Sequence, residues 1–376
     1  MYPDLSYLFN EIFKTPIDNP ISVFKIYGVS LALTFGICSI LLKQEFKRRE
    51  GILQFYKQKV LSVYIENVFI SILSTLIGYK LIHIVLNLQG FKLNPRDMIL
   101  SWHGNILGGL IFLFCAIFII YYSQEPLNQN LKKTIYFYKL TPHLSVVVIT
   151  FALIGTKILG ICEVDFSEKT FYQIFNESGT NFLGGLLGGI IGGFLFCRLF
   201  KVPFYHLLDT IAPIMMLGYS LGRLGCHISG DGCWGIENSF SKPNWFLLPD
   251  WLWAYNYPHN VVDKGTTMFN SAVKHNKVLE IPVFPTPLYE ALFGLIMFSL
   301  FWRYRKKITR PYFLFIFFVL SIGIERFFIE FIRINKKYNF LDFHLSQAQF
   351  ISLGMILFSI VFLVKNYYYK YETIQS

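Results

Sequence analysis

The stretch HLLDTIAPIMMLGYSLGRLGCHISGDGCWG, residues 206–235, joins an apolar run to a polar, glycine-rich ending. The run has the length and composition of a helix that crosses a lipid bilayer, which needs about 20 mostly apolar residues. Arg223 lies near the end of this run, and His227 and Asp231 follow it. A charged side chain within a membrane costs about 3 kcal/mol on insertion scales and faces a bundle interior or a wet cavity. The stretch therefore indicates a membrane protein with a polar site near one end of this helix.

Composition gives the same class for the whole chain. Of its 376 residues, 54% are apolar, 18% are aromatic and 15% are charged, whereas about 25% of the residues in soluble domains are charged. We therefore expect an all-α polytopic membrane protein with a single integral membrane domain over residues 1–376. Apolar segments of spanning length predict about nine transmembrane helices, near residues 21–42, 62–87, 99–122, 142–162, 180–200, 207–227, 284–302, 311–333 and 347–366.

The net charge of +11 follows from membrane topology and does not indicate a nucleic-acid partner. Basic residues collect in alternate connections, which is typical of loops on the cytoplasmic side. The pattern predicts that the N-terminus lies outside and the C-terminus lies in the cytoplasm. The basic connections are residues 43–50, residues 131–139, Arg198 with Lys201, and residues 303–310. These residues also suit contact with anionic membrane lipids.

The predicted topology brings polar residues from three helices to one depth, near the outer surface of the membrane. They are Arg223 in the sixth helix, Tyr289 and Glu290 in the seventh, and Arg326, Glu330 and Arg333 in the eighth. The last three are spaced four and three residues apart, so a helix places them on one face. This concentration of charge predicts a polar cavity open to the outer leaflet.

The arginines of this group suggest what the cavity binds. Arg326 and Glu330 have the spacing of an ion pair, and in that case they neutralise each other. Arg223 and Arg333 have no equally obvious partner nearby in the sequence. A guanidinium group binds phosphate oxygens through two parallel hydrogen bonds. The arginines therefore indicate a site for a phosphate group.

Glycines indicate how the helices pack. The segment GGLLGGIIGG, residues 184–193, places Gly184, Gly188 and Gly192 on one stripe, where another helix can approach closely. Near the outer end of that helix, Gly184 and Gly185 also leave room for a lipid headgroup. The sequence also contains a short internal repeat. IGYK followed by NILGGL is matched later by IGTK followed by NFLGGL. The repeat is explained either by a duplicated helix pair or by parallel use of small residues.

Several motifs in order resemble a known family. NFLGGLLGG, the stretch 206–235, TPLYEA, ERFFIEFIR and LSQAQFISLGM are together similar to prolipoprotein diacylglyceryl transferase, the bacterial inner-membrane enzyme of lipoprotein maturation. The likeness covers roughly residues 151–365 and YGVSLALTFGI at 27–37. The ending GDGCWG resembles the form found in Bacteroidetes. Relative to shorter members, residues 62–139 look like an additional helix pair.

The resemblance implies an activity and a location. The family transfers a diacylglyceryl group from phosphatidylglycerol to the thiol of a lipobox cysteine in a prolipoprotein signal peptide, and glycerol phosphate is released. The expected location is the bacterial cytoplasmic (inner) membrane, with several spans and an active site open to the outer leaflet. No cofactor is expected. A cavity with fixed positive charge suits this chemistry, because the leaving phosphate gains negative charge.

The resemblance also assigns residues. Arg223 matches the arginine of the family signature and Arg326 the essential arginine of the penultimate helix, and both are expected to act on the phosphate. Other matching positions are expected to bind the substrates; they are Gly184, Asp231, Gly235, Tyr289, Glu290, Glu330 and Arg333.

Some positions depart from the family pattern, and they affect the choice of a base. Leu183 stands where many members have histidine, and Ile322 where they have tyrosine. Cys226 replaces the signature asparagine. Candidate bases are His227 and Asp231 beside the signature, or His103 in SWHGN. A histidine at the place of His103 also suits a helix cap at the membrane interface.

Cysteines near the signature allow one further interpretation. Cys226 and Cys233 lie near the expected outer face and are suited to form a disulfide. With His227 they resemble a metal site only weakly, because a fourth ligand is missing, and we expect no metal.

Two other function classes remain open from the sequence. A transporter of an anionic substrate also needs arginines within the membrane and repeated helix pairs, although the inner halves of these helices carry few charges. A non-catalytic binder of an anionic lipid or a lipoprotein precursor would explain Leu183 and Ile322. Residues 229–283 form either an extracytoplasmic loop or a small head region, and the aromatic segment 245–255 is expected to lie on the outer leaflet.

Overall fold

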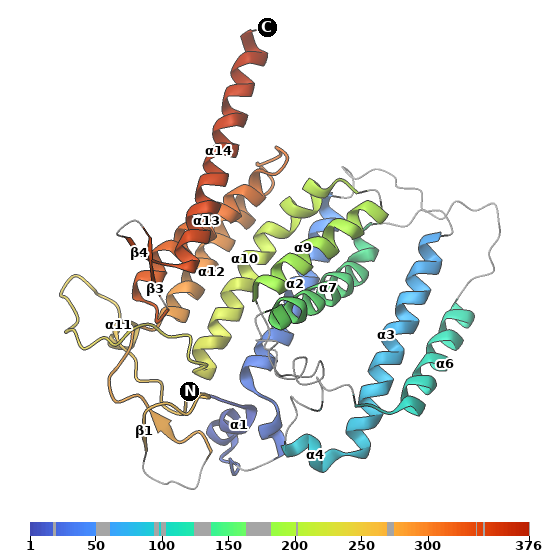
Figure 1. Ribbon diagram of the computed structural model, residues 1–376, viewed down its shortest axis with the longest axis horizontal. Helices are drawn as coiled ribbons and strands as arrows, with labels where there is room; N and C mark the ends of the chain where they lie inside the picture. The colour runs from blue at the N-terminus through green and yellow to red at the C-terminus, as the bar shows by residue number, and fades with distance from the viewer. Residues whose placement is uncertain are drawn as a thin grey trace. The chain divides into compact units, whose positions relative to one another are not determined.

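The computed structural model divides the chain into two compact units, and each is described by itself. The first unit combines Met1–Leu42 with Leu208–Ser376, and the second is Lys43–Leu207. Both are built mainly from helices (Figure 1). The structure describes residues 1–17, 20–49, 61–93, 98, 103–123, 137–162, 182–200, 202–268, 274–335, 337–340 and 343–375.

The first unit holds most of the predicted site residues. Its long helices are α2 (Ile26–Arg49), α10 (Phe204–Ser229), α12 (Thr286–Tyr304), α13 (Phe313–Ile329) and α14 (Gln347–Gln375). Its short helices are α1 (Leu5–Phe13), η1 (Pro20–Val23), α11 (Asp250–Trp253) and η3 (Glu330–Ile332). Two antiparallel hairpins pair β1 (Thr266–Thr267) with β2 (Lys277–Val278), and β3 (Lys337–Phe340) with β4 (Phe343–Ser346). These hairpins depart from a purely α-helical chain, but both lie in connections between helices.

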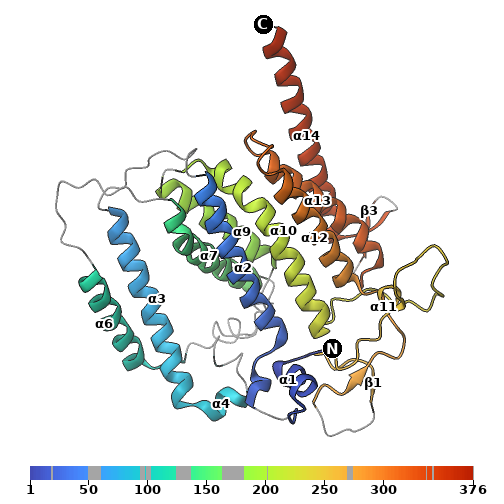
Figure 2. The ribbon, with the colours of Figure 1, turned by 180° about the vertical axis from the view of Figure 1, so that it is seen from behind.

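Small residues let the helices of this unit pack closely. A side-chain carbon added to Gly294 of α12 would lie 2.9 Å from Cβ of Ser220 in α10. The Ser220 hydroxyl donates a hydrogen bond to the carbonyl of Ala291 at 2.6 Å. Between α13 and α14, a carbon added to Gly323 would lie 3.2 Å from the carbonyl of Ser352. Figures 1 and 2 show α12, α13 and α14 side by side, as this packing requires.

A buried carboxylate fixes the start of α13. The first N–H groups of a helix have no partner within the helix. Asp209 of α10, which is 5% exposed, accepts hydrogen bonds from the N–H of Tyr312 at 2.7 Å and of Phe315 at 3.0 Å. A negative charge at this end is also favoured by the helix dipole. The contact holds the start of α13 against α10, and Arg326 lies farther along the same helix.

The described residues of the segment 229–283 gather around a small core, against which Met1 also packs. Trp234, Tyr257 and Val283 are buried together, and Tyr255 and Leu279 pack against them. Their chain is held by the fully buried Asn260, whose amide donates to the carbonyls of residues 257, 264 and 277. An aromatic segment projects from this core, with Trp245 at 74% and Leu247 at 91% exposure.

The second unit contains two helix pairs, and glycines lie at the contact of each. Its elements are α3 (Leu61–Leu86), α4 (Leu88–Leu93), α6 (Ile106–Ser123), η2 (Phe137–Leu140), α7 (Thr141–Cys162) and α9 (Phe182–Leu199). In the pair of α3 and α6, a carbon on Gly78 would meet the carbonyl of Gly108. In the pair of α7 and α9, a carbon on Gly155 would meet the carbonyl of Gly184. The two contacts use equivalent positions of the repeated motifs.

Adjacent glycines of α9 provide a test of this packing. A carbon added to Gly188 would collide with the carbonyl of Phe151, whereas one on Gly189 would lie 3.6 Å from Val148. We expect Gly188→Ala to lower the free energy of unfolding by about 1–3 kcal/mol, the usual cost of overpacking. Gly189→Ala is the matched control and should be neutral or slightly stabilising, because alanine favours helix. Thermal unfolding in detergent measures both, and equal effects would contradict the packing.

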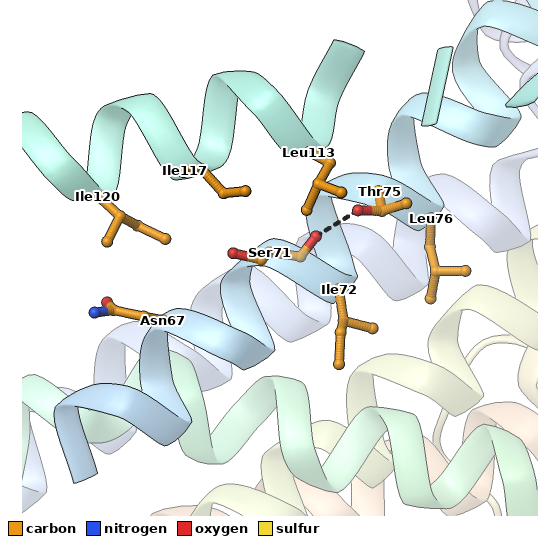
Figure 3. Close-up of a pocket in the computed structure, with 8 residues that line it drawn as sticks. All are labelled: Asn67, Ser71, Ile72, Thr75, Leu76, Leu113, Ile117 and Ile120. Atoms are coloured by element: carbon orange, nitrogen blue, oxygen red, sulfur yellow. Dashed lines mark hydrogen bonds between the residues drawn. The ribbon is translucent and has the colours of Figure 1, made fainter. Parts of the chain in front are cut away.

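A cavity of about 460 Å³ lies between α3 and α6 (Figure 3). Its wall is almost entirely apolar, and the residues that line it are Asn67, Ser71, Ile72, Thr75, Leu76, Leu113, Ile117 and Ile120. The Thr75 hydroxyl is already bonded to the carbonyl of Ser71. The cavity includes none of the predicted site residues, and its surface suits hydrocarbon.

The structure confirms a helical membrane protein. Among the described residues, three helices are long and apolar enough to cross a membrane, namely Ile26–Arg49, Thr141–Ile161 and Gln347–Asn366. Large apolar side chains remain exposed along them, such as Leu33 at 63% and Val361 at 64%, which is the surface that lipid covers. The predicted boundaries shift in places, because α6 begins only at Ile106 and α13 ends at Ile329. Residues 131–136 and Lys201 of the predicted basic connections lie outside the described residues.

Candidate active site

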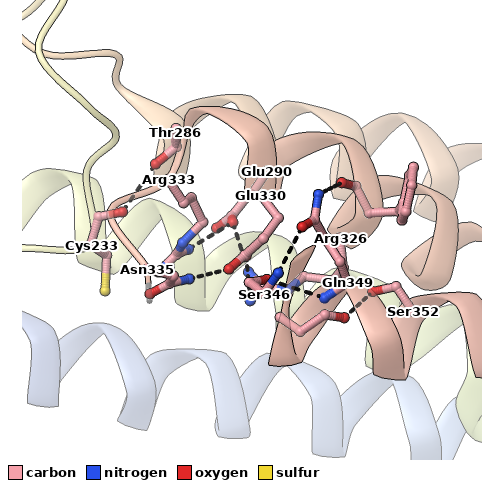
Figure 4. Close-up of polar contacts among 12 residues, drawn as sticks. Cys233, Thr286, Glu290, Arg326, Glu330, Arg333, Asn335, Ser346, Gln349 and Ser352 are labelled. Atoms are coloured by element: carbon pink, nitrogen blue, oxygen red, sulfur yellow. Dashed lines mark hydrogen bonds and ion pairs between the residues drawn. The ribbon is translucent and has the colours of Figure 1, made fainter. Parts of the chain in front are cut away.

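Three arginines converge on one buried carboxylate, Glu290, and Figure 4 shows two of them, Arg326 and Arg333. Glu290 lies in the second turn of α12, and its side chain is fully buried. Arg223 Nε of α10 is 2.6 Å from Glu290 Oε2. Arg326 Nη1 of α13 is 3.2 Å and Arg333 Nη1 is 2.9 Å from Glu290 Oε1. The carboxylate therefore holds together charges that come from three separate segments.

A second buried carboxylate completes the cluster. Glu330 is 1% exposed, and its Oε2 lies 3.5 Å from Arg326 Nη2. Its other oxygen accepts a hydrogen bond from the amide of Asn335 (Figure 4). Three guanidinium groups thus contact two carboxylates directly, so these ion pairs leave an excess of positive charge. The arginine side chains are 13–22% exposed, so a ligand can reach them.

Arg223 and Arg333 have no partner nearby in the sequence, but both pair with the distant Glu290. One expectation about the arginines was wrong, because Arg333 does not share a helical face with Arg326. Helix α13 ends at Ile329, and Arg333 is extended, with φ −91° and ψ 154°. The chain leaves the helix before Arg333, yet its side chain returns to the same carboxylate.

Residues 233–236, where the stretch 206–235 ends, are hydrogen-bonded to the segments that carry the arginine cluster. Gly235 donates its N–H to the carbonyl of Phe284 at 2.9 Å, and Ile236 donates to Ile332 at 2.8 Å. A side-chain carbon on Gly235 would collide with the carbonyl of Ile332, so this close approach requires glycine. The hydroxyl of Thr286 donates to the carbonyl of Cys233 at 3.0 Å (Figure 4). These bonds fix the start of α12 and the end of α13 against the signature.

The turn after α10 gathers two thiols and a carboxylate. Gly230 and Gly232 have φ of +62° and +88°, a left-handed backbone that favours glycine. Asp231 Oδ1 accepts the N–H of Cys233 at 3.1 Å. The ligand atoms of Cys226, Asp231 and Cys233 lie within 4.8 Å of one another. Both cysteines are free thiols rather than the disulfide considered from the sequence. The cluster offers three ligands, whereas structural zinc sites use four.

We expect the thiol of Cys233 to ionise at a lower pH than an ordinary cysteine. A hydrogen bond from the Cys226 thiol lowers the pKa of Cys233, because it stabilises the thiolate. A lowered pKa keeps the thiolate present to lower pH, so alkylation of Cys233 should reach half its maximal rate below the usual value of about 8.5. Cys226→Ala should move that midpoint upward. Peptide mapping after iodoacetamide treatment across a pH series measures the shift, and an unchanged midpoint in the variant would contradict this hydrogen bond.

The remaining predicted residues lie in different surroundings. The Tyr289 hydroxyl donates to the carbonyl of Leu252 and so connects α12 to the folded region 229–283. Buried His227 contacts Tyr257, with Nδ1 3.0 Å from the hydroxyl, and it packs on Tyr255. His227 therefore lies in an aromatic environment, with a tyrosine hydroxyl as a polar partner.

Two predicted residues belong to the second unit. Gly184 is buried at the contact of α7 and α9. His103 is exposed before the start of α6, and its carbonyl accepts a hydrogen bond from Lys80 at 2.9 Å.

Sequence reasoning missed three residues around the cluster. Asn335 bonds Glu330, and Tyr219 donates to Glu325 at 2.9 Å. Glu325 carries a signal in the sequence, because it is a further carboxylate within a predicted span and directly precedes Arg326. Tyr219 and Asn335 carry no comparable signal.

Comparisons with known proteins identify relatives of this chain. Proteins named phosphatidylglycerol–prolipoprotein diacylglyceryl transferase from Xanthomonas oryzae pv. oryzae (strain PXO99A) and Stenotrophomonas maltophilia (strain R551-3) are 30% identical over 195 residues and 33% identical over 200 residues. Each of these matches covers 50% of this chain and 62% of the relative. A protein of the same name from Leptospira interrogans is 30% identical over 166 residues, 44% of each chain.

The matched segments therefore span less than two thirds of the relatives' own length. The family model of prolipoprotein diacylglyceryl transferase matches residues 116–365, which include α10, α12, α13 and the whole arginine cluster. This chain belongs to the prolipoprotein diacylglyceryl transferase family.

Proposed function

We propose that this chain transfers the diacylglyceryl group of phosphatidylglycerol to the thiol of a lipobox cysteine in a prolipoprotein signal peptide. The observation that carries the proposal is the convergence of Arg223, Arg326 and Arg333 on Glu290. The family match and the names of the relatives support the same reaction. A phosphate-containing lipid supplies the ligand that such a cluster binds.

The arginines stabilise the phosphate while the diacylglyceryl group is transferred. The peptide sulfur forms a bond to the glyceryl carbon, and the bond between that carbon and the phosphate oxygen breaks. Its electron pair stays on the phosphate, which leaves as glycerol phosphate with an additional negative charge. Arg223 and Arg326 are positioned before the reaction by Glu290, so they stabilise this charge without reorganising.

Other residues hold the substrates in this proposal. Asp231, Gly235 and Tyr289 shape the end of the site beside residues 206–235. Glu330 and Arg333 complete the charged cluster around Arg223 and Arg326. Gly184 matches the headgroup position of the family, and its role here rests on that resemblance. By the same resemblance, residues 62–139 are an addition relative to shorter family members, and α3 and α6 are the long helices described within it.

We also propose the topology on which the reaction depends. About nine spans, with the N-terminus outside, place the cluster toward the outer leaflet of the bacterial inner membrane, where prolipoprotein signal peptides are exposed. The alternate basic connections support this orientation. The exposed side chains of Trp245, Leu247 and Trp251 support a contact of this segment with the outer leaflet.

A peptide assay tests the function. Purified protein in detergent is mixed with phosphatidylglycerol and a lipobox peptide, and mass spectrometry follows the peptide. The proposal predicts a mass gain of one diacylglyceryl group that requires the cysteine and is absent from the peptide with serine instead. A folded protein that binds the lipid and never modifies the peptide would favour a binder or transporter.

A further inference from the structure

Glu325 has one oxygen atom that the fold leaves without a hydrogen bond. It lies on α13 directly before Arg326, and it is 8% exposed. Its Oε2 accepts a hydrogen bond from the Tyr219 hydroxyl at 2.9 Å. Its Oε1 is buried and has no hydrogen-bond partner among the described residues. A buried carboxylate oxygen without a partner is costly, so a hydrogen donor that reaches this atom when substrate binds would be stabilised there.

Tyr219 connects Glu325 to the arginine cluster. It lies on α10 one turn before Arg223, whose guanidinium carbon is 5.5 Å from the centre of the Tyr219 ring. Charged groups from each helix of the cluster act on Glu325, namely Arg223 on α10, Glu290 on α12 and Arg326 on α13 itself. Glu325 is therefore connected through Tyr219 to the charges that would hold the phosphate and lies within their electrostatic influence.

We propose that Glu325 is the general base of the transfer and that Tyr219 is its positioning residue. This inference rests on the proposed function. The proton of the peptide thiol passes to Glu325 Oε1 as the sulfur bonds to the glyceryl carbon. The carbon–oxygen bond to phosphate breaks, and its electron pair remains on the leaving glycerol phosphate. The proton leaves Glu325 afterwards, to the departing phosphate or to water.

Charge balance favours this residue as the base. An ionised Glu325 offsets part of the positive charge on the neighbouring arginines. When it takes the thiol proton, it becomes neutral, and the positive charge of the cluster acts fully on the phosphate. This happens as the phosphate gains negative charge, so one proton transfer activates the sulfur and strengthens binding of the leaving group. His227 lies instead among tyrosine rings.

The decisive variant is Glu325→Gln, because glutamine keeps the shape and still accepts the Tyr219 hydrogen bond. We expect the single-turnover rate with a cysteine peptide at pH 7 to fall about 100-fold, within the usual range for loss of a general base. Binding of phosphatidylglycerol should stay within about twofold, since the arginines remain. The residual rate should rise with pH as the peptide thiol ionises in solution. Glu280→Gln, an exposed glutamate outside the cluster, is the matched control and should behave as wild type.

A lipobox peptide with selenocysteine in place of cysteine shows whether Glu325 acts as a base or has only a structural role. Its selenol is already ionised at neutral pH, so it needs no base, and Glu325→Gln should transfer to it at about the wild-type rate. Tyr219→Phe, which removes only the positioning hydroxyl, should slow the cysteine reaction about tenfold and leave the selenocysteine reaction unchanged. This second variant tests the proposal if Glu325→Gln fails to fold.

Two results would overturn the inference: a wild-type rate of the glutamine variant with the cysteine peptide, or an equal loss with both peptides. A wild-type protein that modifies neither peptide would overturn the proposed function itself. The outcomes are distinguishable because the wild-type reaction is measured first with both peptides.

Discussion

Glu290→Gln is expected to disable this protein more completely than any other single isosteric change in the cluster. The variant removes the negative charge that Arg223, Arg326 and Arg333 share, and it leaves Glu330 in contact with Arg326. Breaking a buried ion pair by removing one partner costs about 3–5 kcal/mol, because the other charge remains buried and uncompensated. Here three guanidinium groups lose the same partner, so we expect a loss of stability in this range and a transfer rate at least about 100-fold lower.

Thermal unfolding in detergent and the peptide assay measure the two effects. Glu237→Gln is the control, since Glu237 is exposed on the folded region 229–283, and surface changes usually stay within about 0.5 kcal/mol. If Glu290→Gln were as stable and as active as the control, Glu290 could not be the residue that organises the arginines.

Arg326→Ala is expected to abolish transfer while the protein still folds. Arg326 contacts both buried carboxylates, Glu290 and Glu330, and remains 22% exposed toward a ligand. Loss of one preorganised donor at a developing oxyanion lowers kcat about 100- to 1000-fold. Arg326→Lys should recover only part of this rate, because an ammonium group cannot make the two parallel hydrogen bonds of a guanidinium.

The control for this variant is Arg303→Ala, which removes an exposed arginine in the last turn of α12. Rates at saturating phosphatidylglycerol separate the chemical step from lipid binding. Equal rates for Arg326→Lys and the wild type would show that charge alone suffices. An active Arg326→Ala would remove this residue from the catalytic group.

The membrane class and the residues of the arginine cluster could be predicted from the sequence, because both depend on local patterns. Apolar runs of spanning length identify helices directly, and charges within them are rare enough to mark Arg223, Glu290 and Arg326 as a group. The glycine stripe of residues 184–193 likewise predicted a close helix contact, which Gly184 and Gly188 make with α7.

The pairing within the cluster could not be read from the sequence. Glu290 meets Arg223 and Arg333 across 67 and 43 positions of the chain, and such contacts appear only when the helices pack. The end of α13 at Ile329 also follows from tertiary contacts, because Arg333 pairs in an isolated bridge with Gly235. Sequence periodicity predicted that this helix continues to Arg333. It therefore placed Arg333 on the same helical face as Arg326, which was wrong.

The most direct test of the central claim counts both products of one reaction. Thioether-linked peptide and free glycerol phosphate are measured in the same mixture of protein, phosphatidylglycerol and cysteine lipobox peptide. The account predicts that they form in equal amounts with wild-type protein and that both disappear in Arg223→Ala and Arg326→Ala. Release of glycerol phosphate without thioether, or equal formation of both products by the arginine variants, would contradict it.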